Sequence, residues 1–224
     1  MRSGLLPALL LAASLSLHST LSVAEDDVRV WDFRVTLDGK DIGYHRFASS
    51  PQGGMEQVDI EAEFKVKVLF VTAYRYAHRN QEQWQDGCLL RIESETDDNG
   101  SQFTVRGERV DGSYQIKHNA DLSEHALGCL RSFSYWDPGI LDAQRLLNAQ
   151  TGLIEEVEFE FLGTESFALG AGSVEANRYR LSTPDKDITL WYEQDGGRWL
   201  GLETLAKGDR VLRYEPDQLP QRAG

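Results

Sequence analysis

The chain has 224 residues, of which 41% are hydrophobic and 10% aromatic, which is enough to build a core and excludes a disordered chain. It carries 23 basic and 36 acidic residues. The resulting net charge of −13 argues against nucleic acid or an anionic lipid surface as the main partner.

The first 24 residues have the three parts of a secretory signal peptide. Arg2 supplies the positive charge, an apolar run extends from Leu5 to Leu17, and Ser22-Val23-Ala24 forms a small-x-small cleavage site. The apolar run is short for a membrane span, which disfavours the alternative of an uncleaved anchor. We therefore predict a periplasmic or secreted chain that begins at Glu25 and has no transmembrane segment after cleavage.

Alternation with period two dominates the remaining chain and predicts strands with one buried face. The first such strand buries Trp31, Phe33, Val35 and Leu37, and the turn at Asp38-Gly39-Lys40 leads to a return strand. The longest run buries the even positions and exposes the odd ones, with Val58, Ile60, Ala62, Phe64, Val66 and Val68 on the buried face. The stretch from Val66 to Ala73 is almost entirely apolar, which indicates either a bend covered on both faces or an exposed apolar tip.

Further strands are separated by turn signals, namely Asp86-Gly87, Asp98-Asn99-Gly100, Asp111-Gly112, Asp195-Gly196-Gly197 and Lys207-Gly208-Asp209. The helical spacing of Ile140, Leu141, Leu146 and Leu147 predicts one short helix over residues 139–150. These elements predict a mainly β fold, a strongly curved antiparallel sheet or half-open barrel of about ten strands, with the short helix over its opening. We expect a single domain over residues 25–215 and a frayed tail over residues 216–224.

The chain has two cysteines, Cys88 and Cys129. A pair of cysteines in an exported chain predicts a disulfide, and two buried free thiols are the alternative. A CxxC motif is absent from the sequence, so thiol exchange is not the expected activity.

The densest polar and aromatic segment provides the candidate ligand-binding residues, which are Tyr74, Arg75, Tyr76, His78, Arg79 and, further along, Trp136. In a pocket, Arg75 or Arg79 could bind a carboxylate or phosphate head group. The structural alternative is that the aromatic side chains cap a β core and that their polar tips reach its rim. The sequence leaves both interpretations open.

Several blocks of residues resemble a proteobacterial exported family known as a domain of unknown function. The blocks are Ala73-Tyr74-Arg75-Tyr76-Ala77-His78-Arg79-Asn80 with Glu82, Trp84 and Asp86-Gly87-Cys88; Gly128-Cys129 with Phe133, Tyr135-Trp136-Asp137-Pro138, Leu146-Leu147-Asn148 and Gln150-Thr151-Gly152; and the segments Tyr179-Arg180-Leu181 and Leu190-Trp191-Tyr192. The resemblance covers most of the chain after the signal peptide and implies no activity. It implies an architecture similar to the curved-sheet carriers of lipids and lipoproteins in the cell envelope, and a shared fold does not imply a shared function.

Motifs for catalysis or cofactor binding are absent from the sequence, including GxSxG, Walker A, GxGxxG and HExxH. The four histidines after the signal peptide (His45, His78, His118 and His125) lack the spacing of a metal pair, so we expect no metal and no cofactor. The acidic pairs, such as Glu61 and Glu63, alternate with apolar residues and are typical of a solvated sheet face.

These observations leave three hypotheses. The first is a binding protein that holds a lipid, acyl chain or other apolar ligand inside the curved sheet. The second is an envelope protein that docks another protein without a ligand. The third, an enzyme that uses the Tyr76, His78 and Arg79 cluster, is the least favoured because no catalytic motif supports it.

Overall fold

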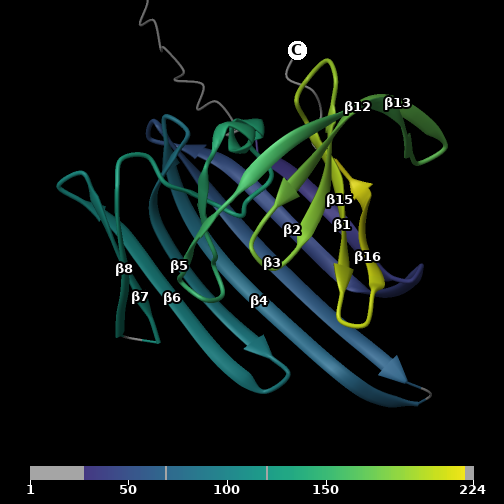
Figure 1. Cartoon of the computed structure of the whole chain (residues 1–224), viewed down its shortest axis with the longest axis horizontal. Coiled ribbons are helices and arrows are strands. Elements are labelled where there is room, and N and C mark those ends of the chain that lie inside the picture. The colour runs from purple at the N-terminus through teal and green to yellow at the C-terminus, as the bar shows by residue number, and fades with distance from the viewer. Residues whose placement is uncertain (1–27, 69, 120, 220–224) are drawn as a thin grey trace, which may run out of the picture.

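The computed structural model describes residues 28–68, 70–119 and 121–219. Within these ranges, thirteen antiparallel strands form one large sheet and three short strands form a second. The two edge strands of the large sheet do not pair with each other, so the barrel stays half open (Figure 1). The expected fold class is therefore confirmed, with more strands than the ten expected. The signal peptide predicted for residues 1–24 lies outside the described residues.

The large sheet joins the two ends of the domain, because the last strand pairs with the first. Its spatial order is β12 (Glu158–Leu169), β13 (Gly172–Ser182), β14 (Asp187–Glu193), β15 (Trp199–Ala206), β16 (Arg210–Gln218), β1 (Arg29–Leu37), β2 (Lys40–Gln52), β3 (Met55–Val68), β4 (Val71–Gln85), β5 (Cys88–Asp98), β6 (Ser101–Val110), β7 (Ser113–His118) and β8 (Asp121–Leu127). β16 continues past residue 215, where we expected the ordered domain to end, because Pro216 pairs with Phe33 of β1.

The hairpin turns follow the sequence signals. Asp38-Gly39, Asp86-Gly87, Asn99-Gly100 and Asp111-Gly112 all have positive φ at both positions. This backbone matches the type I′ turn, which suits the twist of antiparallel strands and requires residues that tolerate positive φ. The turns thus fix the register of the strands they join.

The inner face of the sheet is defined by the side chains that build the core. Trp31, Phe33, Val35 and Leu37 of β1 are all buried, as predicted, and so are Val58, Ile60 and Ala62 of β3. Further along β3, Phe64 and Val66 are only half-buried. The alternation was therefore predicted correctly, and burial weakens toward one end of the strand.

A cap segment, residues 129–157, covers the other end of the inner face. It contains β9 (Arg131–Ser132), the 3-10 helix η1 (Pro138–Asp142), β10 (Arg145–Leu147) and β11 (Ile154–Glu156). The disulfide between Cys88 and Cys129 ties its start to β5, which confirms the predicted pairing. In Figure 1 most of this segment lies at the upper end of the sheet, so we call that end the closed end and the opposite one the open end. The turn around Gln150 reaches down the inner face and contacts Tyr76 and Asp98.

The prediction of a helix over residues 139–150 was wrong. The Asp137 side chain accepts a hydrogen bond from the Gly139 backbone nitrogen, which begins a single turn of 3-10 helix, and extended backbone at Ala143 ends it. Leu146 and Leu147 then belong to β10, which pairs with β9 and β11. The apolar residues of the segment are buried as a helix would bury them, but strand pairing decides their backbone conformation.

Candidate functional site

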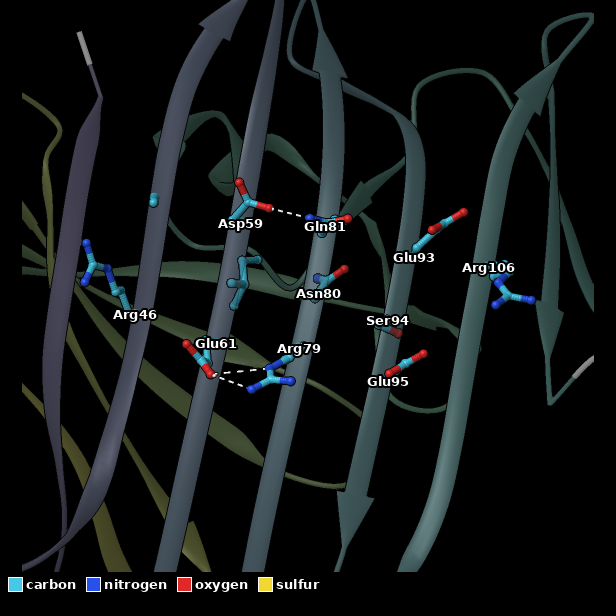
Figure 2. A pocket seen from close by; sticks show the side chains of 12 residues that line it. Arg46, Asp59, Glu61, Arg79, Asn80, Gln81, Glu93, Ser94, Glu95 and Arg106 are labelled. Atoms are coloured by element: carbon cyan, nitrogen blue, oxygen red, sulfur yellow. Dashed lines mark hydrogen bonds and ion pairs between the residues drawn. The ribbon is translucent and has the colours of Figure 1, made fainter. Parts of the chain in front are cut away.

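The candidate residues on β4 lie on both faces of the sheet. Alternation divides them into three side chains on the inner face (Tyr74, Tyr76 and His78) and two on the outer face (Arg75 and Arg79). The Arg79 side chain is 77% exposed and pairs with Glu61 of β3 at 3.3 Å (Figure 2). The structure therefore does not bring Arg79 together with Tyr76 and His78, and the arginine expected beside a bound head group lies on the opposite face.

Burial increases steadily along the inner face of β4, from the open end to the closed end. Tyr74 and Tyr76 are half-buried, His78 is 8% exposed, and Glu82 and Trp84 are almost wholly buried. β4 thus runs from half-buried tyrosines at the open end to a fully buried glutamate, Glu82, at the closed end.

At the open end, aromatic rings and a small polar network lie together. The Tyr76 ring stacks on Phe64 of β3 with 5.3 Å between centroids, and its hydroxyl donates to Gln150 Oε1 at 3.2 Å. Asp98 accepts from the Tyr74 hydroxyl at 2.8 Å and from Gln150 Nε2 at 3.2 Å. Burial is the main cause that raises the pKa of both tyrosines well above the ordinary value, so both hydroxyls stay protonated near neutral pH.

Two histidines lie in one row across the inner face, His45 on β2 and His78 on β4, with Ala62 of β3 registered between them. His78 Nδ1 lies 2.8 Å from Thr96 Oγ1, and His45 Nδ1 lies 3.0 Å from the Tyr214 hydroxyl. Burial lowers the pKa of His78 to about 4, and burial together with the nearby His78 lowers that of His45 to about 3. Both rings are therefore neutral at physiological pH, and His45 Nε2 is buried without a hydrogen-bond partner among the described residues.

At the closed end, the buried carboxylate of Glu82 connects the sheet to the cap segment. Its two oxygens accept hydrogen bonds of 2.7 to 2.9 Å from four donors, namely Asn80 Nδ2, Trp84 Nε1, Ser132 Oγ and Ser134 Oγ. Burial raises the pKa of Glu82, and these hydrogen bonds act in the opposite direction. Since the two serines belong to the cap segment, this network and the disulfide hold the cap in place.

Sequence reasoning did not identify the role of Glu82, although a signal for it was present. Glu82 occupies an inner-face position in the alternation of β4, where a charged residue is rare unless it has partners. The donors Ser132 and Ser134 lie about fifty positions along the chain, so the pattern could not identify them.

Trp136, the last candidate residue, lies at the closed end. Its ring contacts those of Trp84 and Trp31, with centroids 5.7 and 6.2 Å away. It also lines a hollow of about 550 Å³ beside the β4–β5 turn, together with Arg131 and Asp137. This position separates Trp136 from Tyr74 and Tyr76, so the six candidate residues do not form one pocket.

A second hollow, of about 510 Å³, lies on the outer face of the sheet and is lined by charged side chains (Figure 2). Arg46, Glu61, Arg79 and Glu95 lie directly opposite one another on four successive strands. Cross-strand pairs of opposite charge stabilise a solvated sheet face, which accounts for this arrangement without a ligand. The expectation that the acidic pairs lie on a solvated face agrees with this placement.

The described residues show no group of three or more histidine, cysteine, aspartate or glutamate side chains that could hold a metal ion. Within the same residues, no helix is long and apolar enough to cross a membrane. The inner face instead offers aromatic surface, neutral imidazoles and protonated hydroxyls at the open end.

These features define a half-open antiparallel β-barrel. Its closed end contains the buried hydrogen-bond network of Glu82, and its open end has half-buried aromatic side chains on the inner face, including Phe64 and Tyr76. The chain belongs to DUF6134, a domain of unknown function whose family model matches residues 33–217. The fold is similar to the crystal structure of a β-barrel-like protein of domain of unknown function DUF1849 from Brucella abortus. The TM-score is 0.64 and the identity 10%, with 88% of this chain and 98% of that chain covered. At this identity the likeness shows the fold alone, and no curated protein sequence matches the chain.

Proposed function

We propose that this protein is an exported, non-catalytic binding protein that holds an acyl chain against the inner face at the open end. The observation that carries the proposal is the row of half-buried aromatic side chains there. Phe64, Tyr76 and Phe103 are half-buried and belong to β3, β4 and β6, and the Phe64 and Tyr76 rings stack on each other.

The charges of this region favour an uncharged acyl ester or amide over a free fatty acid. Asp98 already lies among the polar groups of the open end, and the two arginines of β4 are on the other face. A carboxylate head group would therefore meet a like charge without a compensating cation. Gln150 Nε2 carries a second N–H beside the one that it donates to Asp98, and this neutral donor suits an ester carbonyl.

The expected affinity follows from the area that an acyl chain buries. Burial contributes about 0.8 kcal/mol per methylene, so a chain of about sixteen carbons contributes about 13 kcal/mol if fully covered. Association costs of about 5 kcal/mol would leave about 8 kcal/mol, which corresponds to a Kd of about 1 μM. If the inner face covers only part of the acyl chain, the affinity is lower than this Kd.

A titration with a fluorescent long-chain acyl ester tests the proposal. The wild-type chain should bind with micromolar affinity, the matching free fatty acid should bind more weakly, and Phe64→Glu should abolish binding because it places a charge in the aromatic row. Leu205→Glu is the matched control, because Leu205 is 58% exposed on another strand. If the wild-type chain binds neither probe, the proposal fails and a protein-docking module, the second hypothesis from the sequence, replaces it.

A further inference from the structure

The hairpin of β3 and β4 continues past its last pairs with β2 and β5, while β2 itself runs on to Lys40 in pairing with β1. The last pair between β2 and β3 is Gly43 with Phe64, and the first between β4 and β5 is Tyr76 with Asp98. Beyond these positions β3 and β4 pair with each other through residues 65–75. At about 3.3 Å per residue, this two-stranded ribbon continues about 10 Å beyond those pairs, and Figure 1 shows it at the lower edge of the molecule.

The tip of this ribbon is apolar and faces solvent. Phe70 is 99% exposed and Val71 is 70% exposed. Of the two sequence-based interpretations of this stretch, the structure therefore has the exposed apolar tip. A fully exposed phenylalanine at the end of a hairpin is unfavourable in water, and it is typical of a surface that meets an apolar phase or a partner.

The charge of the ribbon is opposite to that of the whole chain. Residues 65–75 contain Lys65, Lys67 and Arg75 and no acidic residue, in a chain of net charge −13. Two acids contact the ribbon at its base, where Glu63 is 3.3 Å from the Lys65 amine and Asp98 accepts from the Tyr74 hydroxyl. Because the Debye length at physiological ionic strength is about 8 Å, acidic groups farther away on the sheet are largely screened from the tip.

We infer that the β3–β4 ribbon docks onto an anionic lipid bilayer, with Phe70 and Val71 inserted below the phosphates and Lys65, Lys67 and Arg75 at phosphate level. The spacing supports this occupant. The pair Lys65–Arg75 lies three registered pairs from the tip pair Val68–Val71, or about 10 Å. Apolar side chains of interfacial segments enter the headgroup boundary by about 5–10 Å, which would bring Lys65 and Arg75 level with the phosphates. Lys67 lies one registered pair from the tip pair, and its long side chain would reach the phosphates from there.

The inference does not rest on the proposed ligand, because it depends on the exposed tip and not on the inner face. The net charge of −13 argues against an anionic surface as a partner for the whole molecule. It does not argue against contact through the basic ribbon alone. A variant that loses acyl-ester binding, Phe64→Glu, should therefore keep binding to vesicles if it folds.

Co-sedimentation of the disulfide-bonded chain with vesicles tests the inference. The wild-type chain should bind phosphatidylglycerol-rich vesicles in low salt and should not bind pure phosphatidylcholine vesicles. Lys67→Glu should weaken binding at least fivefold, since each basic residue at an anionic surface contributes about that factor. Phe70→Ser should weaken it by about tenfold, in proportion to the apolar area it no longer buries.

Matched controls come from the closed end of the sheet. Leu127 is 76% exposed and Arg109 is exposed, so Leu127→Ser and Arg109→Glu remove similar groups away from the ribbon and should leave binding unchanged. All four sites are exposed, and circular dichroism should show the same fold for every variant. Equal loss in the controls, or no vesicle binding by the wild-type chain, would overturn the inference and leave the tip as a contact for another protein.

Discussion

Acidification from about pH 7.5 to about pH 5 should destabilise the fold through the two histidines of the inner face. Each ring is neutral in the folded chain, because burial lowers the pKa of His78 to about 4 and that of His45 to about 3, from 6.5 in the unfolded chain. Between the folded and unfolded values the unfolded chain binds more protons. The stability from each histidine is therefore fully present above pH 6.5 and is lost as the pH falls toward the folded pKa.

The magnitude follows from the pKa difference. At about pH 5 the unfolded chain has gained most of a proton per histidine and the folded chain almost none. Over the 1.5 units below 6.5, at 1.36 kcal/mol per unit, each histidine removes about 2 kcal/mol and the pair removes about 4 kcal/mol. This loss is a large fraction of the stability of a typical domain.

Urea unfolding of the wild-type chain and of the double variant His45→Gln/His78→Gln at both pH values provides the assay. Other groups titrate in both proteins, so the difference between the two pH dependences isolates the histidines. We expect the wild-type chain to lose about 4 kcal/mol more than the double variant. Equal losses would refute the reasoning, as would NMR titration of the two imidazoles in the folded wild-type chain with midpoints near 6.5.

Three further predictions concern the core and the cap. Glu82→Ala should cost about 3–5 kcal/mol in the free energy of unfolding, because it leaves four buried donors without their acceptor; a cost below about 1 kcal/mol would show that the network contributes little. Replacing both Cys88 and Cys129 by serine should lower stability by about 4 kcal/mol on the chain-entropy model, given the 41-residue separation; unchanged urea midpoints would contradict this. Ile60→Ala should cost about 2–5 kcal/mol and Asp59→Ala less than about 0.5 kcal/mol, and similar costs would show that the register of β3 is wrong.

The strands and their faces could be predicted from sequence because the alternation in β1 and β3 is nearly unbroken. A shift of one residue would invert every side chain of β3, so Val58 and Ile60 have only one stable placement. The Asp-Gly and Asn-Gly turns add independent evidence, since few residues tolerate their backbone. Local information was sufficient for these elements.

The cap segment could not be predicted in the same way, because long-range contacts decide its conformation. Leu146 and Leu147 fit a helical period and a short buried strand equally well, and only pairing of β10 with β9 and β11 distinguishes them. The candidate site shows the same limit. The candidate residues were chosen because they are close in sequence, but alternation along β4 puts Arg79 on the face opposite Tyr76, and long-range packing puts Trp136 at the other end of the sheet.

Native mass spectrometry of the chain, purified from its host without denaturant, tests the proposed acyl-binding function most directly. The account predicts an adduct whose mass, after solvent extraction, corresponds to an uncharged acyl ester or amide, and it predicts that Phe64→Glu removes the adduct while Leu205→Glu keeps it. The account would be contradicted by a wild-type chain that carries no lipid and gains none when the purified protein is incubated with an acyl ester.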